Sequence, residues 1–223
     1  MGVELTRSTD ERNAEGTHGN HAMKYGCAIL AGGRGSRMGE VNKAELAYQG
    51  RAFIDLIAEE LEQLELPCYL SSANYAQKNR HGWIHVPDDI TDENGEYIGP
   101  MGGIFSCLRR AEADGLDGLF FVPCDAPLFT SAEMSILGAH IEKGVDAVIW
   151  QTADGRLQPT FGYFGTSCLP KIRDFIERKN YKLRMLLGEI NCRILRADEY
   201  AVPEKCFRNV NKIEDYEALI PEL

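Results

Sequence analysis

Short apolar runs alternate with amphipathic stretches along most of this chain. The apolar runs predict strands at 25–33, 67–74, 83–89, 116–128, 146–152 and 158–164. The stretches with helical periodicity lie at 53–66, 75–80, 99–115, 131–144, 168–179 and 181–190, and residues 206–219 suggest a closing strand followed by a helix. Strands that alternate with helices in this way favour an α/β domain, with a mostly parallel sheet covered by helices on both faces.

Polar or glycine residues follow four of the predicted strands. They are the glycine turn after Leu30, residues 72–74, the pair Asp88 and Asp89, and the pair Cys124 and Asp125. In a parallel sheet, ligands bind beyond the carboxyl ends of the strands. We therefore expect these four segments to share one site.

The segment LAGGRGSRMGEVNKAEL, residues 30–46, is typical of a phosphate-binding turn after a strand. It lacks the Gly-Lys-Ser/Thr of a P-loop. A dinucleotide fingerprint starting at Gly33 would need a third glycine where Met38 stands, and an acid where the next strand ends in Asn74. The order Leu-Ala-Gly-Gly, Arg-Met-Gly and Lys instead resembles the nucleotidyltransferase pattern. There, glycines admit a triphosphate, and Arg37 and Lys43 neutralise the leaving pyrophosphate.

Further motifs extend this resemblance over residues 25–216. In order along the chain they are VPDD, GPMGGI, VPCDAPL, QPTFGYF, YKLRMLL and NVNKIEDY. With them, the sequence is similar to the molybdenum cofactor guanylyltransferases of the MobA type. The resemblance implies a single-domain, Rossmann-like three-layer sandwich of the nucleotide-diphospho-sugar transferase kind. It also implies transfer of GMP from GTP to the phosphate of molybdopterin, with release of pyrophosphate.

The resemblance assigns roles to individual residues of this sequence. Asp125 follows a buried strand as a hard oxygen ligand suited to Mg²⁺, and Asn211 matches a second metal contact that Asn209 could support. The catalytic set is Arg37, Lys43 and Asp125, and the nucleotide-binding set is Leu30, Ala31, Gly32, Gly33, Lys43, Ser72, Asp88 and Asp125. Asp89 is an alternative to Asp88 as the nucleotide contact.

Two positions depart from the family pattern and leave alternatives open. Asn42 stands before Lys43 where an Asp is usual, and Ser72 stands where an Asn is usual. A cytidylyltransferase or another small-acceptor nucleotidyltransferase on the same scaffold is therefore retained. Two alternatives of a different class are a binding-only member that has lost catalysis and a dinucleotide-dependent oxidoreductase.

The composition limits which partners and which cellular compartment we expect for this protein. The net charge is -10, which argues against general binding to nucleic acid or anionic membranes. Seven cysteines without a CxxC spacing indicate neither a disulfide framework nor a zinc site, and so favour a reducing cytoplasm. Residues 1–22 lack the apolar segment of a signal peptide and are interpreted as a disordered tail before a domain at 23–223. The resemblance adds transient contacts with cofactor-biosynthesis proteins and with the molybdoenzymes that receive the cofactor.

Overall fold

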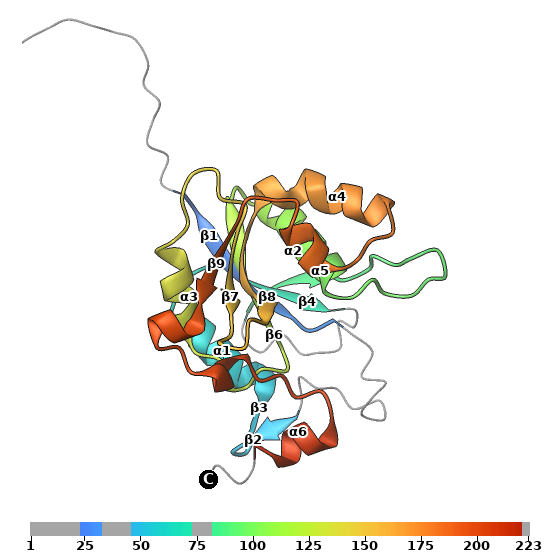
Figure 1. The fold of residues 1–223 in the computed structure, drawn as a ribbon. Coiled ribbons are helices and arrows are strands. Elements are labelled where there is room, and N and C mark those ends of the chain that lie inside the picture. The colour runs from blue at the N-terminus through green and yellow to red at the C-terminus, as the bar shows by residue number, and fades with distance from the viewer. Residues whose placement is uncertain (1–22, 33–45, 73–81, 220–223) are drawn as a thin grey trace, which may run out of the picture.

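The structure is a computed structural model that describes residues 23–32, 46–72 and 82–219. Its central feature is a seven-stranded sheet in the order β5-β4-β1-β6-β8-β7-β9, and β2 and β3 form a separate two-stranded sheet (Figure 1). The strands are β1 Tyr25–Leu30, β2 Ala47–Tyr48, β3 Arg51–Ala52, β4 Cys68–Ser72, β5 Ile84–Pro87, β6 Gly118–Pro123, β7 Ala147–Gln151, β8 Leu157–Gly165 and β9 Cys192–Arg196. The helices are α1 Phe53–Glu62, α2 Pro100–Ala113, α3 Ser131–Gly138, α4 Leu169–Glu177, α5 Leu183–Leu187 and α6 Ile213–Glu217, with short 3₁₀ turns at Thr166–Cys168, Ala197–Tyr200 and Glu204–Phe207.

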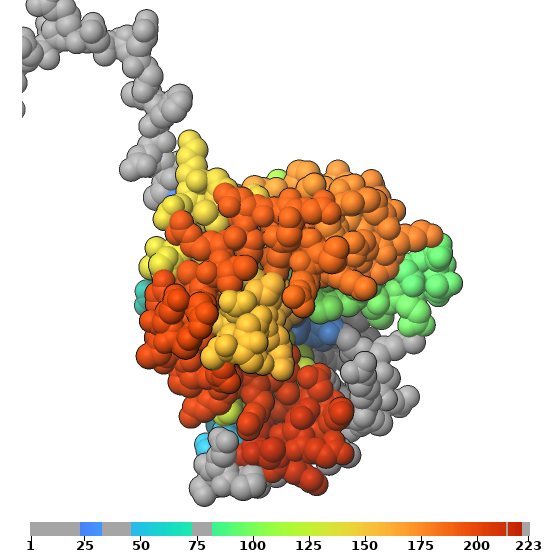
Figure 2. All heavy atoms as spheres, viewed as in Figure 1, coloured from blue at the N-terminus to red at the C-terminus, as the bar shows by residue number. Residues whose placement is uncertain are grey.

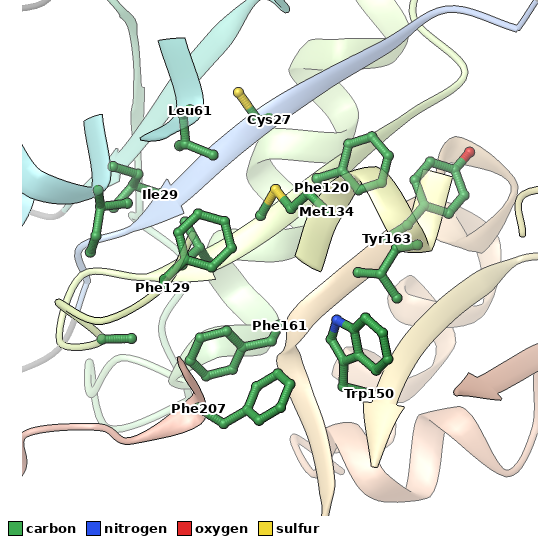
Figure 3. Packing of buried hydrophobic residues seen from close by; sticks show 14 of the residues in the cluster. Cys27, Ile29, Leu61, Phe120, Phe129, Met134, Trp150, Phe161, Tyr163 and Phe207 are labelled. Atoms are coloured by element: carbon green, nitrogen blue, oxygen red, sulfur yellow. The ribbon is translucent and has the colours of Figure 1, made fainter. Parts of the chain in front are cut away.

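Alternate residues of each central strand face opposite layers of helices. In β1, Cys27 and Ile29 pack with α1 and α3, while Ala28 and Leu30 pack with α2, α4 and α5. This two-residue alternation follows from the pleat of a strand. Because apolar residues occupy both phases, the central strands are buried on both sides, as in other sheets with helices on each face. Figure 3 shows the layer shared with α1 and α3, where Leu61 and Met134 face the strands.

The sheet contains a topological switch point between β1 and β6. From β1 the chain continues to β4 and β5 on one side, and then crosses to β6 on the other side of β1. All of these neighbouring pairs are parallel, whereas β8 runs antiparallel to both β6 and β7. In sheets of this type ligands bind beyond the carboxyl ends of the strands at the switch point, which here are β1 and β6.

A third, smaller cluster joins the C-terminal segment to the hairpin β2-β3. Its buried members are Phe53, Val210 and Leu219, and Tyr216 packs against them. The Tyr216 hydroxyl also donates a hydrogen bond of 2.6 Å to the carbonyl oxygen of Ala47. The last part of the chain is thereby fixed beside the segment that follows the glycine-rich turn.

The predicted α/β architecture is confirmed, with corrections at its periphery. The predicted strand within 206–219 is wrong: residues 204–207 form a 3₁₀ turn, and 208–212 make no ladder. The edge strand β9 and the hairpin β2-β3 were not expected, because basic residues interrupt the apolar pattern of β9 and each hairpin strand has only two residues. Helix α3 ends at Gly138, earlier than predicted, and the expected helix at 75–80 and the tail 1–22 lie outside the described residues.

No helix in the described part of the chain has the length and apolar character needed to cross a membrane.

Candidate functional site

The carboxyl ends of four parallel strands lie side by side at one edge of the sheet. Register places Leu30 beside Ser71 on one flank and beside Pro123 on the other. Ser72 in turn lies beside Pro87, the residue before Asp88. The structure therefore brings together the described parts of the four strand ends that the sequence singled out.

Backbone hydrogen bonds continue past the end of β1 and hold the start of the glycine turn. The N–H of Ala31 donates to the carbonyl oxygen of Ser71 at 2.8 Å, and the N–H of Cys124 donates to that of Leu30 at 3.0 Å. Leu30 is buried and Gly32 is exposed. Gly33, Arg37, Asn42 and Lys43 lie outside the described residues, so their roles stay predictions.

Asp88 lies against the glycine turn, in a space that only glycines leave open. A Cβ atom on Gly32 would approach the Oδ2 atom of Asp88 to 2.3 Å, and one on Gly102 would approach Oδ1 to 3.0 Å. Both values are below ordinary van der Waals separation. The carboxylate thus sits between the end of β1 and the first turn of α2. Of the two candidate acids, Asp88 is buried here and Asp89 is exposed.

The Asp88 carboxyl group is poised to change protonation near neutral pH. Its side chain is only 5% exposed, and Oδ1 has no hydrogen-bond partner in the part of the chain that the structure describes. Burial raises the pKa of Asp88 to about 6, and the nearby charge of Asp89 raises it further in the same direction. A buried carboxylate with an unused acceptor is costly unless a ligand donates to it.

Ser72 lies one strand away from β1 and is held by a histidine. Its side chain is 3% exposed, and its Oγ atom lies 3.1 Å from Nε2 of His85 on β5. The carbonyl oxygen of Ser72 accepts a hydrogen bond from the N–H of Asp88 at 3.1 Å. Ser72 therefore connects the β4 end to Asp88 through the backbone and to His85 through its hydroxyl.

Asp125 follows β6 directly and is tied to the C-terminal segment. Its carbonyl oxygen accepts a hydrogen bond of 2.8 Å from the N–H of Val210. Asn209 and Asn211 flank that position, so both asparagines lie within one residue of the point where the C-terminal segment meets Asp125. Further on, the Asp215 carboxylate accepts hydrogen bonds of 2.9 Å from the N–H groups of Asn211 and Lys212, which fixes the turn into α6.

The oxygen atoms of Asp125 and of the neighbouring asparagines are ligands of the kind that a hard divalent cation prefers. A bound substrate would supply the remaining ligands. The Oδ1 atom of Asn209 is buried and has no hydrogen-bond partner among the described residues. The same part of the chain contains no group of three His, Cys, Asp or Glu side chains that could hold a metal by itself. Carboxylate and amide oxygens are preferred by Mg²⁺, which commonly takes its remaining ligands from phosphates and water. The residues present fit a cation that arrives with a nucleotide.

Two features of the site escaped the sequence reasoning. His85 received no role from the sequence, yet it contacts Ser72, and the pairing of β4 with β5 was needed to bring them together. Gly102 and Gly103 were noted only as part of the GPMGGI motif and of a predicted helix. Their closeness to Asp88 and Ser71 indicates that they make room for polar groups. The sequence placed these residues near the end of a strand or the start of a helix. It did not give the strand register, which shows which of them lie close together.

The space-filling view shows how this edge of the sheet is hollowed. In Figure 2 the blue of residues 25–32 lies deep between the red C-terminal segment and the gold atoms where β7 leads into β8.

Comparisons with known proteins agree with this architecture. Residues 27–194 match the MobA-like NTP transferase domain family. The chain is 31% identical over 183 residues to the molybdenum cofactor guanylyltransferase of Vibrio cholerae, which covers 82% of this chain and 85% of that protein. The structure of molybdopterin-guanine dinucleotide biosynthesis protein A from Archaeoglobus fulgidus superposes with a TM-score of 0.70 at 20% identity, covering 90% of this chain and 98% of that one. A Mycobacterium tuberculosis protein in complex with manganese superposes with a TM-score of 0.58 at 17% identity, covering 90% of this chain and all (100%) of that one.

Proposed function

This chain belongs to the MobA-like NTP transferase family, and from that premise we propose that it transfers the guanylyl group of GTP to the phosphate of molybdopterin. The products are the guanine dinucleotide form of the cofactor and pyrophosphate. The observation that carries the proposal is that β1, which leads into the glycine turn, and β6, which leads into Asp125, end side by side at the switch point of the sheet, in a chain 31% identical to a guanylyltransferase.

The proposed reaction is an in-line displacement without a protein nucleophile. An oxygen of the acceptor phosphate forms a bond to the α-phosphorus of GTP, while the bond from that phosphorus to the pyrophosphate oxygen breaks. Positioning and charge stabilisation therefore supply the catalysis. The backbone at Ala31 and Gly32 borders the triphosphate in this scheme, and Arg37 and Lys43 neutralise the pyrophosphate as it leaves.

Asp88 and Ser72 serve the nucleotide end of the site in this proposal. Once ionised, Asp88 accepts hydrogen bonds from N–H or O–H groups of the bound nucleotide, which compensates for its burial. We assign the Ser72 hydroxyl, which lies 3.1 Å from Nε2 of His85, to the same nucleotide. A serine has one donor and two acceptor sites, and so offers less than the usual asparagine amide.

Asp125 is proposed as the main protein ligand of Mg²⁺. The amide oxygens of Asn209 and Asn211 are the additional candidates, and the buried, unpartnered Oδ1 atom favours Asn209 for a role beyond the supporting one that the sequence suggested. When bound, Mg²⁺ supplies positive charge that orients and neutralises the nucleotide phosphates. The likeness in fold to a protein in complex with manganese is consistent with the use of a divalent cation.

The proposal also covers partners and compartment. GTP and molybdopterin are the substrates, and the enzyme acts in the cytoplasm. The pterin passes to and from this site through transient contacts with cofactor-biosynthesis proteins and with the molybdoenzymes that receive it. Nucleic acid is not a partner, because the net charge of -10 opposes a general polyanion surface.

A panel of nucleotides tests the proposal against its alternatives. The melting temperature of the full chain is measured with GTP, CTP, ATP or NADH, each with and without Mg²⁺, since a ligand that binds the folded state raises it. We expect the largest rise with GTP and Mg²⁺. A larger rise with CTP indicates a cytidylyltransferase, and a rise with NADH alone indicates an oxidoreductase. GTP binding without pyrophosphate release, when acceptor and Mg²⁺ are present, indicates a binding-only member.

A further inference from the structure

Two cysteines on neighbouring strands face each other on one side of the sheet, away from the residues of the proposed site. Cys27 on β1 and Cys68 on β4 are register partners in a parallel pair. Their Sγ atoms lie 3.0 Å apart although the residues are 41 positions apart in the sequence. Both side chains belong to the layer that packs against α1 and α3, and Figure 3 shows Cys27 there beside Leu61.

The backbone already has the dimensions of a disulfide. Neighbouring strands lie about 4.8 Å apart, and disulfides join Cα atoms about 4.4–6.8 Å apart. Partners in a parallel pair project to the same face of the sheet, and the two Sγ atoms accordingly lie 3.0 Å apart. The sulfur atoms have only to close from thiol contact to a bond of about 2 Å.

The two thiols differ in their access to solvent. Cys27 is fully buried, at 0% exposed, and its Sγ atom also points at the carbonyl oxygen of Pro67. Cys68 is half-buried and lies 3.2 Å from the carbonyl oxygen of Leu66. An external reagent therefore reaches Cys68 first, and Cys27 is placed behind it.

The pKa shifts of the two thiols also favour Cys68 as the one that reacts first. The hydrogen bond from Cys27 lowers the pKa of Cys68, and so favours the nucleophilic thiolate at the more accessible position. That bond and burial raise the pKa of Cys27. Burial raises the pKa of Cys107 and of Cys168 to about 12, which leaves these thiols protonated.

We propose that Cys27 and Cys68 form a dithiol site for low-molecular-weight disulfides, at which the chain is reversibly oxidised to a Cys27–Cys68 disulfide. The Cys68 thiolate attacks one sulfur of the reagent and forms a mixed disulfide, releasing one thiolate. Cys27 loses its proton and attacks the Cys68 sulfur, releasing the second thiolate. Two protein thiols and one disulfide thus become one protein disulfide and two small thiols, and an excess of reduced thiol reverses the exchange.

This bond would connect β1 to β4, the strands that end at the glycine turn and at Ser72. It would cross-link the chain over the 41-residue separation of the two cysteines, which restricts the unfolded state. The inference does not depend on the proposed function, because it concerns strands and thiols that lie outside the reacting groups.

Mass spectrometry of the intact, folded chain tests it. The protein is incubated with oxidised glutathione, blocked with an alkylating agent, and digested without reduction. We expect a single cross-linked peptide pair containing Cys27 and Cys68, no retained glutathione, and a higher melting temperature that a reductant returns to its starting value. A different cysteine pairing, or stable glutathione on Cys68 in the wild type, would contradict the proposal.

Three variants test whether Cys68 attacks the reagent first and Cys27 then resolves the mixed disulfide. Cys27→Ala is expected to accumulate glutathione on Cys68, because the resolving thiol is gone. Cys68→Ser is expected to slow the loss of free thiols by about tenfold or more, and Cys192→Ser, which removes another half-buried cysteine, is expected to react like the wild type. If Cys68→Ser is modified as fast as the wild type, Cys68 is not the attacking thiol. If a variant does not fold, the peptide pairing of the wild type still decides the matter.

Discussion

At the scale of single residues, glycines make room for the polar groups of the candidate site because they have no side chain. Gly32, Gly102 and Gly103 come from two segments, and each lacks a side chain where a polar atom of Asp88 or Ser71 lies. Sequence reasoning explained Gly32 by the approach of a phosphate and Asp88 by family likeness. It had no means to see that the first makes room for the second, because their contact depends on the register of β1, β4 and β5.

Gly32→Ala tests this packing. The added methyl would lie 2.3 Å from Oδ2 of Asp88, so either the turn or the carboxylate must move. We expect kcat/KM for GTP to fall by about tenfold or more, since small displacements of binding groups are costly in catalysis. Gly138→Ala is the matched control, because its Cβ would meet only the Cζ atom of Phe120 at 3.5 Å. Steady-state kinetics of both variants should show a loss in the first alone; equal kinetics would contradict the packing argument.

Asp88→Asn tests the cost of the buried acid. In the folded chain its carboxyl pKa is raised from 3.8 to about 6. Between these values the folded state holds more protons than the unfolded state, so the free energy of unfolding falls as pH rises through this window. The neutral asparagine avoids that loss. We expect the variant to be more stable than the wild type by about 1–2 kcal/mol at pH 7.5, after allowance for solvent screening, and nearly equal to it at pH 4.

Urea unfolding at the two pH values measures this difference, and an unchanged difference between them would show that Asp88 is not the titrating group. The same variant should bind GTP more weakly, because an amide replaces the ionised acceptor. In the wild type, GTP binding should weaken as pH falls below about 6, when Asp88 gains a proton. A KM for GTP that is flat from pH 5 to pH 8 would contradict the proposed contact.

At the scale of elements, the strands with continuous apolar runs were predictable and the irregular segments were not. β1 and β6 are buried along nearly their whole length, so the two-residue alternation and the apolar composition agree. The segment 208–212 contains a single apolar residue, Val210, which packs against Phe53 instead of pairing in a sheet. The packing of Val210 joins residues that are far apart in the sequence, and it became visible only in the folded structure.

Tyr216→Phe tests whether that cluster positions the asparagines beside Asp125. The change removes the hydroxyl that donates to Ala47 and keeps the ring against Phe53. We expect a stability loss of about 1 kcal/mol and a severalfold decrease in kcat, as the segment carrying Asn209 and Asn211 loosens. The control is Tyr200→Phe, which removes a hydroxyl lying 2.9 Å from Nε2 of His140 on another part of the fold.

Thermal unfolding and turnover of the two phenylalanine variants are compared directly. A similar stability loss is expected in both, with a decrease in kcat only in Tyr216→Phe. If the two variants lose activity equally, the C-terminal segment does not act through the hairpin contact.

At the scale of the whole molecule, the topology determines where the chemistry can occur. The order β5-β4-β1-β6-β8-β7-β9 puts the switch point between β1 and β6, and the glycine turn and Asp125 are the segments that leave those two strands. The alternation of elements predicted the parallel sheet, and the strand-end rule predicted the edge at which the candidate site residues lie. Neither could supply the antiparallel β8, because strand direction within a sheet is not encoded in the apolar pattern.

Asp125 is the residue on which the proposed guanylyl transfer depends most. The direct measurement follows the labelled α-phosphate of GTP into molybdopterin, together with pyrophosphate release, for the wild type and Asp125→Asn at several Mg²⁺ concentrations. We expect labelled dinucleotide from the wild type, and a decrease of about 10²-fold or more in the variant with its fold retained. No labelled product from the wild type, or a variant as active as the wild type at equal Mg²⁺, would contradict the account.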